Sequence, residues 1–244
     1  MTYLIASARR SDLASIRQSS PETWRQVRRY NLPVQLALAA AGEVMTQSRN
    51  PGTMAVISLA PCQPGSADLY RWGDVVTAGM AGGSLGDLRM NPTQTLHAVD
   101  NLAMSAFAIA YGNHSYCLGL GGAAGQAWCA LEVVLERLAF GPEDEALVMA
   151  GDQDRAAENA QGLAVALLFS RRAQPYPALG RPVRLLAVER ELQRAVGAVV
   201  PHAATGLSAL LSAIDDQRRG KLSYVAPFEH TDGVSATTVV LETL

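Results

Sequence analysis

The chain has 244 residues, of which 49% are hydrophobic and 17% charged, so it is long enough and apolar enough to bury a sizeable core. A net charge of −2 excludes the basic surplus of proteins that bind phosphate backbones, so we expect no nucleic-acid partner. Three cysteines are too few for a disulfide framework, which favours a reducing, cytoplasmic compartment.

Strands and helices alternate in the first half of the chain. Ser20 followed by Pro21 is typical of a helix N-cap and first turn. The run from Met54 to Leu59 is apolar throughout, which indicates a short strand buried on both faces. The predicted strands are 3–7 and 54–59, and the predicted helices are 21–30, 33–47 and 69–79.

The second half continues the alternation. An alanine-rich helix is predicted at 100–111, where Gly112 and Asn113 end it as a turn. A small-residue corner at 121–125 follows the next strand and leads into a second buried helix. The predicted strands are 116–120, 145–150, 163–170, 182–189 and 236–242, and the predicted helices are 127–140 and 206–214. This order predicts a layered α/β fold with helices on a central sheet, in a single domain spanning 1–244.

The sequence lacks the patterns typical of metal, dinucleotide and membrane binding. Its four histidines form no cluster with the cysteines, so no metal site is expected. The glycines at 121–125 do not have the spacing of a dinucleotide fingerprint, so no cofactor is expected. No apolar run approaches the roughly 20 residues that span a bilayer, and the N-terminus does not have the order of a signal peptide. We therefore expect no membrane partner.

Three motifs follow one another between Asn91 and Asp154. They read NPTQTLHAVDNLAMSAFAIAYGN, SYCLGLGGAAGQAWCALEVVLERLAFG and EALVMAGDQD. Pro92 precedes Asn101 by nine residues, and a strand, a tight corner, a buried helix and an apolar strand come next. In this order and spacing the segment resembles the β-ketoacyl synthase superfamily of the thiolase fold, especially its short, divergent branch with chain-length factors. The resemblance implies a thiolase-like fold whose second half is truncated.

The nucleophile of a ketosynthase is a cysteine at the N-terminus of the buried helix, where the helix dipole and free amides lower the thiol pKa. Counting from Asn101 puts that position on Ala124, and aligning the small-residue corner puts it on Gly122. Neither side chain can attack a thioester, so no catalytic residue is predicted. Cys117 and Cys129 are interpreted as structural thiols before and after the corner.

Two histidines are the candidates for vestiges of the family's active-site histidines. His202 follows Pro201 and precedes a predicted helix, and His230 stands in a turn near the C-terminus. The ordinary interpretation of both is a surface or hydrogen-bonded side chain.

A group of carboxylates follows the predicted strand at 145–150. Asp152, Asp154 and Glu158 are interpreted as a solvated acidic loop. As an alternative, Asp152 caps the helix that Gly125 leads, or holds a turn.

The strand at 116–120 carries small or apolar residues and no charge that would block pairing at its edge. In the family it resembles, dimers join through this strand. The resemblance therefore implies a heterodimer with a catalytic ketosynthase subunit, to which an acyl carrier protein delivers substrate for fatty acid or polyketide elongation of the polyene type. The residues implied at the interface and acyl tunnel are Gln94, Thr95, Leu96, Met104, Tyr116, Leu118 and Leu120.

Two other functions stay open. One is a non-catalytic homodimer that binds an acyl or polyketide ligand. The other is an acyltransferase or hydrolase that uses Cys117, Cys129 or Ser115, and it needs a nearby histidine and a lowered thiol pKa.

Overall fold

The computed structural model of the chain describes residues 1–12, 25, 27–28, 30–60, 101–121, 124–154, 161–191, 202–217, 220–230 and 233–244. The strands are β1 (Thr2–Arg10), β2 (Ala55–Leu59), β3 (Cys117–Leu120), β4 (Glu145–Asp154), β5 (Gln161–Ser170), β6 (Val183–Glu191), β7 (Gly220–His230) and β8 (Gly233–Thr243). The helices are α3 (Leu32–Val44), α6 (Leu102–Tyr111), α7 (Ala124–Phe140) and α8 (Ala203–Asp215), with short 3-10 turns at Met45–Gln47 and Pro51–Thr53.

The eight strands form one mixed sheet in the order β3-β2-β4-β5-β1-β6-β8-β7. Strands β3, β2 and β4 are parallel to one another, and all other neighbours are antiparallel. Strand β1 joins the two parts of the sheet, because it pairs with β5 along most of its length and with β6 only over Thr2–Leu4. Among the described strands, β3 and β7 are therefore the two edges.

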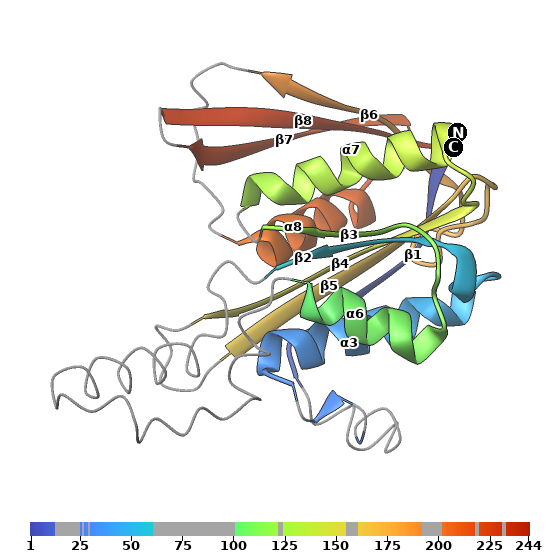
Figure 1. The fold of residues 1–244 in the computed structure, drawn as a ribbon. Helices are drawn as coiled ribbons and strands as arrows, with labels where there is room; N and C mark the ends of the chain where they lie inside the picture. The colour runs from blue at the N-terminus through green and yellow to red at the C-terminus, as the bar shows by residue number, and fades with distance from the viewer. Residues whose placement is uncertain are drawn as a thin grey trace, which may run out of the picture.

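The elements stack in four layers (Figure 1). Helices α7 and α8 lie between the strands β6, β8 and β7 on one side and the remaining five strands on the other, while α3 and α6 cover the opposite face of those five strands. Strand β4 shows how the layers are filled. Val148 faces the core around α7 and α8, whereas Leu147 and Met149 face the core around α3 and α6. Alternate side chains thus pack on opposite faces of one strand.

Helix α3 approaches the sheet closely at its N-terminal end. The Asn31 side chain caps it by accepting a hydrogen bond from Val34 N at 3.3 Å. A Cβ added to Gly151 of β4 would lie 2.2 Å from the Pro33 carbonyl oxygen, which leaves no room for any side chain. Glycine at this position therefore sets how near α3 can lie to β4.

The predicted elements that fall on the described residues are confirmed, with ends shifted by a few residues. Gly112 ends α6 as expected, with a φ of +60° that suits glycine. The predicted helix at 69–79 and most of the one at 21–30 lie outside the described residues.

Strand β7 is the element that the sequence analysis missed. Pro227 stands inside it and Lys221 near its start, and both residues disfavour a strand prediction. Pro227 is tolerated because β7 is an edge strand, where one side of the backbone has no ladder to complete.

None of the described helices is both long and apolar enough to cross a membrane.

Candidate functional site

The carboxyl ends of β2, β3 and β4 lie side by side at the same end of the sheet, because these strands are parallel. Ala60 N donates to Leu120 O at 2.8 Å, which holds the end of β3 beside the end of β2. Figure 1 shows α7 and α8 both beginning at this end of the molecule, and the two helices pack against each other. Two helix N-termini, whose first amides have no partner within their own helix, therefore lie near the corner that follows β3.

Ala124, one of the two predicted nucleophile positions, is the first residue of α7. Gly122, the other, lies outside the described residues. The methyl side chain of alanine has no group that can accept an acyl chain, although the helix start beside it has the dipole that would stabilise an anion.

Asp152 was expected in a solvated loop, and that interpretation is wrong. Both Asp152 and Asp154 belong to β4, and Asp152 is only 5% exposed. The Asp152 carboxylate accepts a hydrogen bond from Ala204 N at 2.8 Å, in the first turn of α8. The capping role considered for Asp152 is thus correct in kind, and the helix amide in this bond belongs to α8. The buried, charged carboxylate of Asp152 is stabilised because it accepts a hydrogen bond from an amide at a helix N-terminus. Glu158 lies outside the described residues.

His202 occupies the N-cap position of α8 with an extended backbone, and it makes no side-chain capping bond. It is partly buried, and its Nδ1 atom is enclosed without a hydrogen-bond partner. His230 is the last residue of β7 and pairs with Gly233 across a hairpin. His202 therefore lies at the start of α8, and His230 lies at the end of β7.

Both described cysteines are half-buried. The Cys117 thiol, at the start of β3, donates to Asn113 Oδ1 at 3.7 Å. Burial raises the pKa of the Cys117 thiol, so the thiol is protonated at neutral pH. A nucleophile needs the opposite shift and a neighbouring base. Cys129 lies in the second turn of α7.

Strand β3 is only four residues long and bonds to β2 alone among the described strands. Tyr116, Leu118 and Leu120 are partly buried and pack against the core around α7 and α8. Met104 is also partly buried, on α6, and packs on the other core. Gln94, Thr95 and Leu96 lie outside the described residues. Four of the seven predicted interface and tunnel residues thus lie on β3, at its start and on the neighbouring helix α6.

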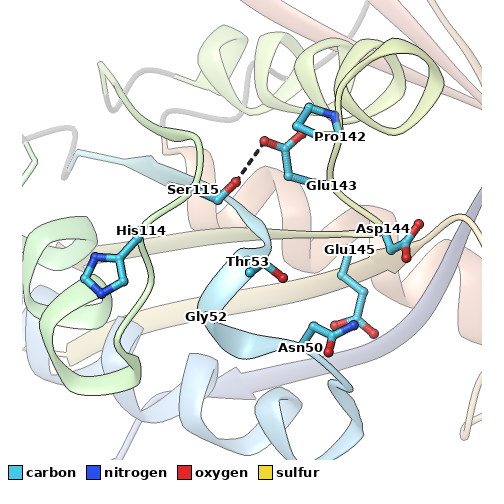
Figure 2. Close-up of a pocket in the computed structure, with 9 residues that line it drawn as sticks. All are labelled: Asn50, Gly52, Thr53, His114, Ser115, Pro142, Glu143, Asp144 and Glu145. Atoms are coloured by element: carbon cyan, nitrogen blue, oxygen red, sulfur yellow. Dashed lines mark hydrogen bonds between the residues drawn. The ribbon is translucent and has the colours of Figure 1, made fainter.

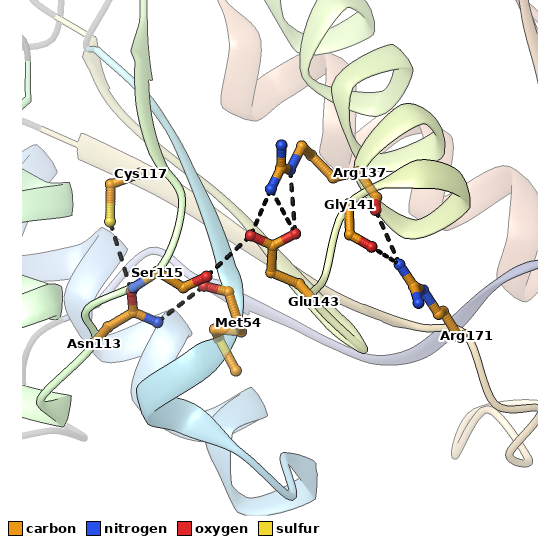
Figure 3. Close-up of polar contacts among 8 residues, drawn as sticks. All are labelled: Met54, Asn113, Ser115, Cys117, Arg137, Gly141, Glu143 and Arg171. Atoms are coloured by element: carbon orange, nitrogen blue, oxygen red, sulfur yellow. Dashed lines mark hydrogen bonds and ion pairs between the residues drawn. The ribbon is translucent and has the colours of Figure 1, made fainter.

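A polar network that the sequence analysis did not find holds the start of β3 (Figure 3). Glu143 is 3% exposed, and its carboxylate accepts two short hydrogen bonds from Arg137 Nη2, at 2.6 and 2.7 Å. Ser115 Oγ donates to the same carboxylate at 2.9 Å. Burial alone would raise the pKa of Glu143, but the hydrogen bonds from Arg137 and Ser115 outweigh it and lower the pKa. Glu143 is therefore ionised at neutral pH.

A cavity of about 330 Å³ opens beside this network, at the amino ends of β2 and β4 and away from the corner after β3. Figure 2 shows the carboxylates of Glu143, Asp144 and Glu145 on one side of it and His114 apart from them. Glu145 is buried and accepts a bond from Ser48 Oγ at 2.6 Å. No group of three His, Cys, Asp or Glu side chains in the described part of the chain is placed to hold a metal ion.

No protein-family model and no curated protein matches the chain. Its structure, however, is similar to several solved structures. The ishigamide ketosynthase/chain length factor matches with a TM-score of 0.64 and 13% identity, over 100% of this chain and 99% of that one. A ketosynthase in complex with its chain length factor from Xenorhabdus doucetiae matches with a TM-score of 0.52 and 12% identity, over 89% and 80%.

A third similar structure is 3-oxoacyl-[acyl-carrier-protein] synthase III from Aquifex aeolicus, with a TM-score of 0.53 and 12% identity, over 99% of this chain and 100% of that one. At such identities the likeness concerns the fold. The chain has a thiolase-like, ketosynthase-like fold, and the fold class predicted from the sequence is confirmed.

Proposed function

We propose that this chain is a non-catalytic, chain-length-factor-like subunit that pairs through the edge of β3 with an active ketosynthase and shapes its acyl tunnel. The complex elongates fatty acid or polyketide chains of the polyene type, with substrate delivered by an acyl carrier protein in the cytoplasm. Two of the similar structures contain a ketosynthase together with a chain length factor, which supports this assignment.

The observation that carries the proposal is the edge of β3, which pairs with β2 alone among the described strands and lies inside an uncharged part of the chain. From Asn101 to Leu131 the sequence contains no Asp, Glu, Lys or Arg. Tyr116 O and Leu120 O accept bonds from β2, so in the alternating ladder of a parallel pair the amides of Cys117 and Gly119 point to the free side. An uncharged edge whose amides point away from β2 favours the addition of a strand from a partner.

The start of α7 supports the absence of independent catalysis. Ala124 stands where the helix dipole is strongest, while Cys117 is protonated and bonds to an amide oxygen that is no base. The partner's nucleophile then carries the chemistry. In this arrangement the tunnel is lined by Gln94, Thr95, Leu96 and Met104. The interface segment is the one that carries Tyr116, Leu118 and Leu120, and the edge bonds to the partner come from the amides of Cys117 and Gly119 between them.

The test is co-expression of the chain with the ketosynthase encoded nearest to it, followed by size-exclusion chromatography with mass detection. A one-to-one complex is expected. It should elongate acyl chains on the carrier protein, whereas each subunit alone should not. A stable homodimer that ignores the ketosynthase would contradict the proposal and favour a homodimeric acyl-binding protein.

A separate experiment tests the alternative that the chain is an acyltransferase. Incubation of the isolated chain with an acyl thioester, followed by mass spectrometry of its peptides, is expected to show no acyl group on Cys117 or Cys129. Stoichiometric acylation of either cysteine would make the chain an enzyme.

A further inference from the structure

Strand β3 needs support from outside the sheet, because a four-residue strand with one neighbour has few ladder bonds of its own. Much of that support comes from the segment just before it. Asn113 is 6% exposed and donates through its side-chain amide to Pro51 O at 2.9 Å and Met54 O at 3.0 Å. Its Oδ1 accepts from Ser115 N at 3.1 Å. Asn113 therefore fixes the turn after α6 to the segment before β2.

Ser115 and Tyr116 connect the start of β3 to the end of α7 and to the segment before β4. Ser115 Oγ donates to the buried Glu143 carboxylate at 2.9 Å, and the guanidinium of Arg137 lies 4.3 Å above the ring of Tyr116. Arg137 belongs to the last turn of α7, and Glu143 precedes β4. The orientation of the first β3 residues thus depends on one ion pair between the end of α7 and the start of β4 (Figure 3).

Arg171 stabilises the turn that carries the Arg137–Glu143 ion pair. Arg171, just after β5, donates to the Gly141 and Arg137 carbonyl oxygens at the end of α7, the latter at 3.3 Å. A Cβ on Gly141 would lie 2.5 Å from Glu143 Oε2, so the turn closes tightly around the carboxylate. Both acceptor oxygens of Glu143 have donors, and the carboxylate has little freedom to move.

We propose that the Ser115–Glu143 hydrogen bond positions the open edge of β3 for the ketosynthase subunit, an inference that rests on the proposed function. Ser115 and Glu143 are positioning residues, since neither lies on the β3 edge that would contact the partner. Their bond restricts the orientation of Tyr116 and of the strand that follows. A strand held in its bound orientation loses less conformational freedom on association, which raises affinity.

A matched pair of substitutions tests this inference on the full chain. Ser115→Ala removes the bond to Glu143. Ser48→Ala removes an equivalent bond, from Ser48 Oγ to the buried Glu145 at 2.6 Å, which supports β4 and does not touch β3. Ser115→Thr keeps the hydroxyl group. For each variant we would measure the affinity for the ketosynthase by titration calorimetry, the melting temperature, and amide hydrogen exchange of residues 117–120 in the free chain.

Ser115→Ala is expected to raise the dissociation constant about tenfold, the effect of one hydrogen bond to a charged group. It should also accelerate exchange at 117–120, and Ser115→Thr should restore both. Ser48→Ala is expected to lower the melting temperature without changing the dissociation constant or the amide exchange of residues 117–120. Equal affinities for the two alanine variants, or unchanged exchange at 117–120, would overturn the positioning role alone. If the unmodified chain binds no ketosynthase, the proposed function falls and the inference falls with it.

Discussion

The two edge strands of the sheet differ in length, composition and support. Strand β7 spans eleven residues, all in register with β8, and it contains Pro227 and the exposed Lys221. Strand β3 spans four uncharged residues and depends on the network around Glu143. Proline and lysine on an edge strand block further pairing. The comparison indicates that the β7 edge is protected against strand addition and the β3 edge is open to it.

A charge on each edge provides the strongest test of this comparison. Gly119→Lys places a charge on β3, where the added Cβ would lie 3.2 Å from the Asn101 Cβ and Asn101 must give way slightly, and Ser223→Lys places a charge on the exposed part of β7. Gly119→Lys is expected to weaken association with the ketosynthase by about a hundredfold or more, because an unpaired charge at a strand interface is costly. Titration calorimetry checks this. Weakening by Ser223→Lys without weakening by Gly119→Lys would mean that β7, and not β3, faces the partner.

The supports of the two edges also predict different stabilities. Glu143→Gln breaks the ion pair behind β3, whereas Glu242→Gln breaks the Arg184–Glu242 pair between β6 and β8, of 2.5 Å. Glu143 is almost fully buried and Glu242 is only half-buried. The first change should lower the free energy of unfolding by about 2–3 kcal/mol and the second by about 1 kcal/mol or less. Urea denaturation measures both, and a reversed order would contradict the comparison.

The pKa of Glu143 extends the comparison to pH. Its pKa lies below the ordinary value of 4.5 in the folded chain, so its ionised form adds stability above that pH. The added stability is lost as the pH falls through the lowered pKa. Below about pH 4.5 the unfolding free energy of the unmodified chain should therefore fall more steeply than that of Glu143→Gln. If the unfolding free energies of the two proteins fell in parallel with pH, Glu143 would not contribute to the pH dependence of stability.

The smallest effect concerns the Cys117 thiol at the start of β3. Because burial raises its pKa, it should react with iodoacetamide at pH 8 several-fold more slowly than a free cysteine. Bound ketosynthase should slow the reaction further by covering β3. Peptide mass spectrometry measures the rate, and a rate equal to that of free cysteine would contradict the half-buried position.

Most elements of the fold followed from local patterns. Alternating or continuous apolar runs identified β4 and β5, and Gly112 identified the end of α6. Strand β7 was missed because its local composition disfavours a strand and its partner β8 supplies the ladder. The role of Asp152 was only half anticipated, because the amide it binds comes from Ala204, far along the chain.

The candidate site was likewise predicted only in part from the sequence. The start of α7 near Ala124 and the uncharged strand after Ser115 were visible in the sequence. The Glu143 network was not, since Ser115 and Glu143 stand 28 residues apart and each is ordinary in its local context. Only the parallel arrangement of β3 and β4 brings the starts of these strands together.

The central position of β1 sets the order in which the chain can acquire its structure during synthesis. Strand β1 is synthesised before the other described strands, yet its neighbours are β5 and β6, and the contact with β6 begins only at Val183. Its apolar face must stay unpaired until those late segments have been made. The sheet around β1 can therefore close only after Val183 has been synthesised, and until then β1 is a natural binding site for chaperones that recognise extended apolar segments.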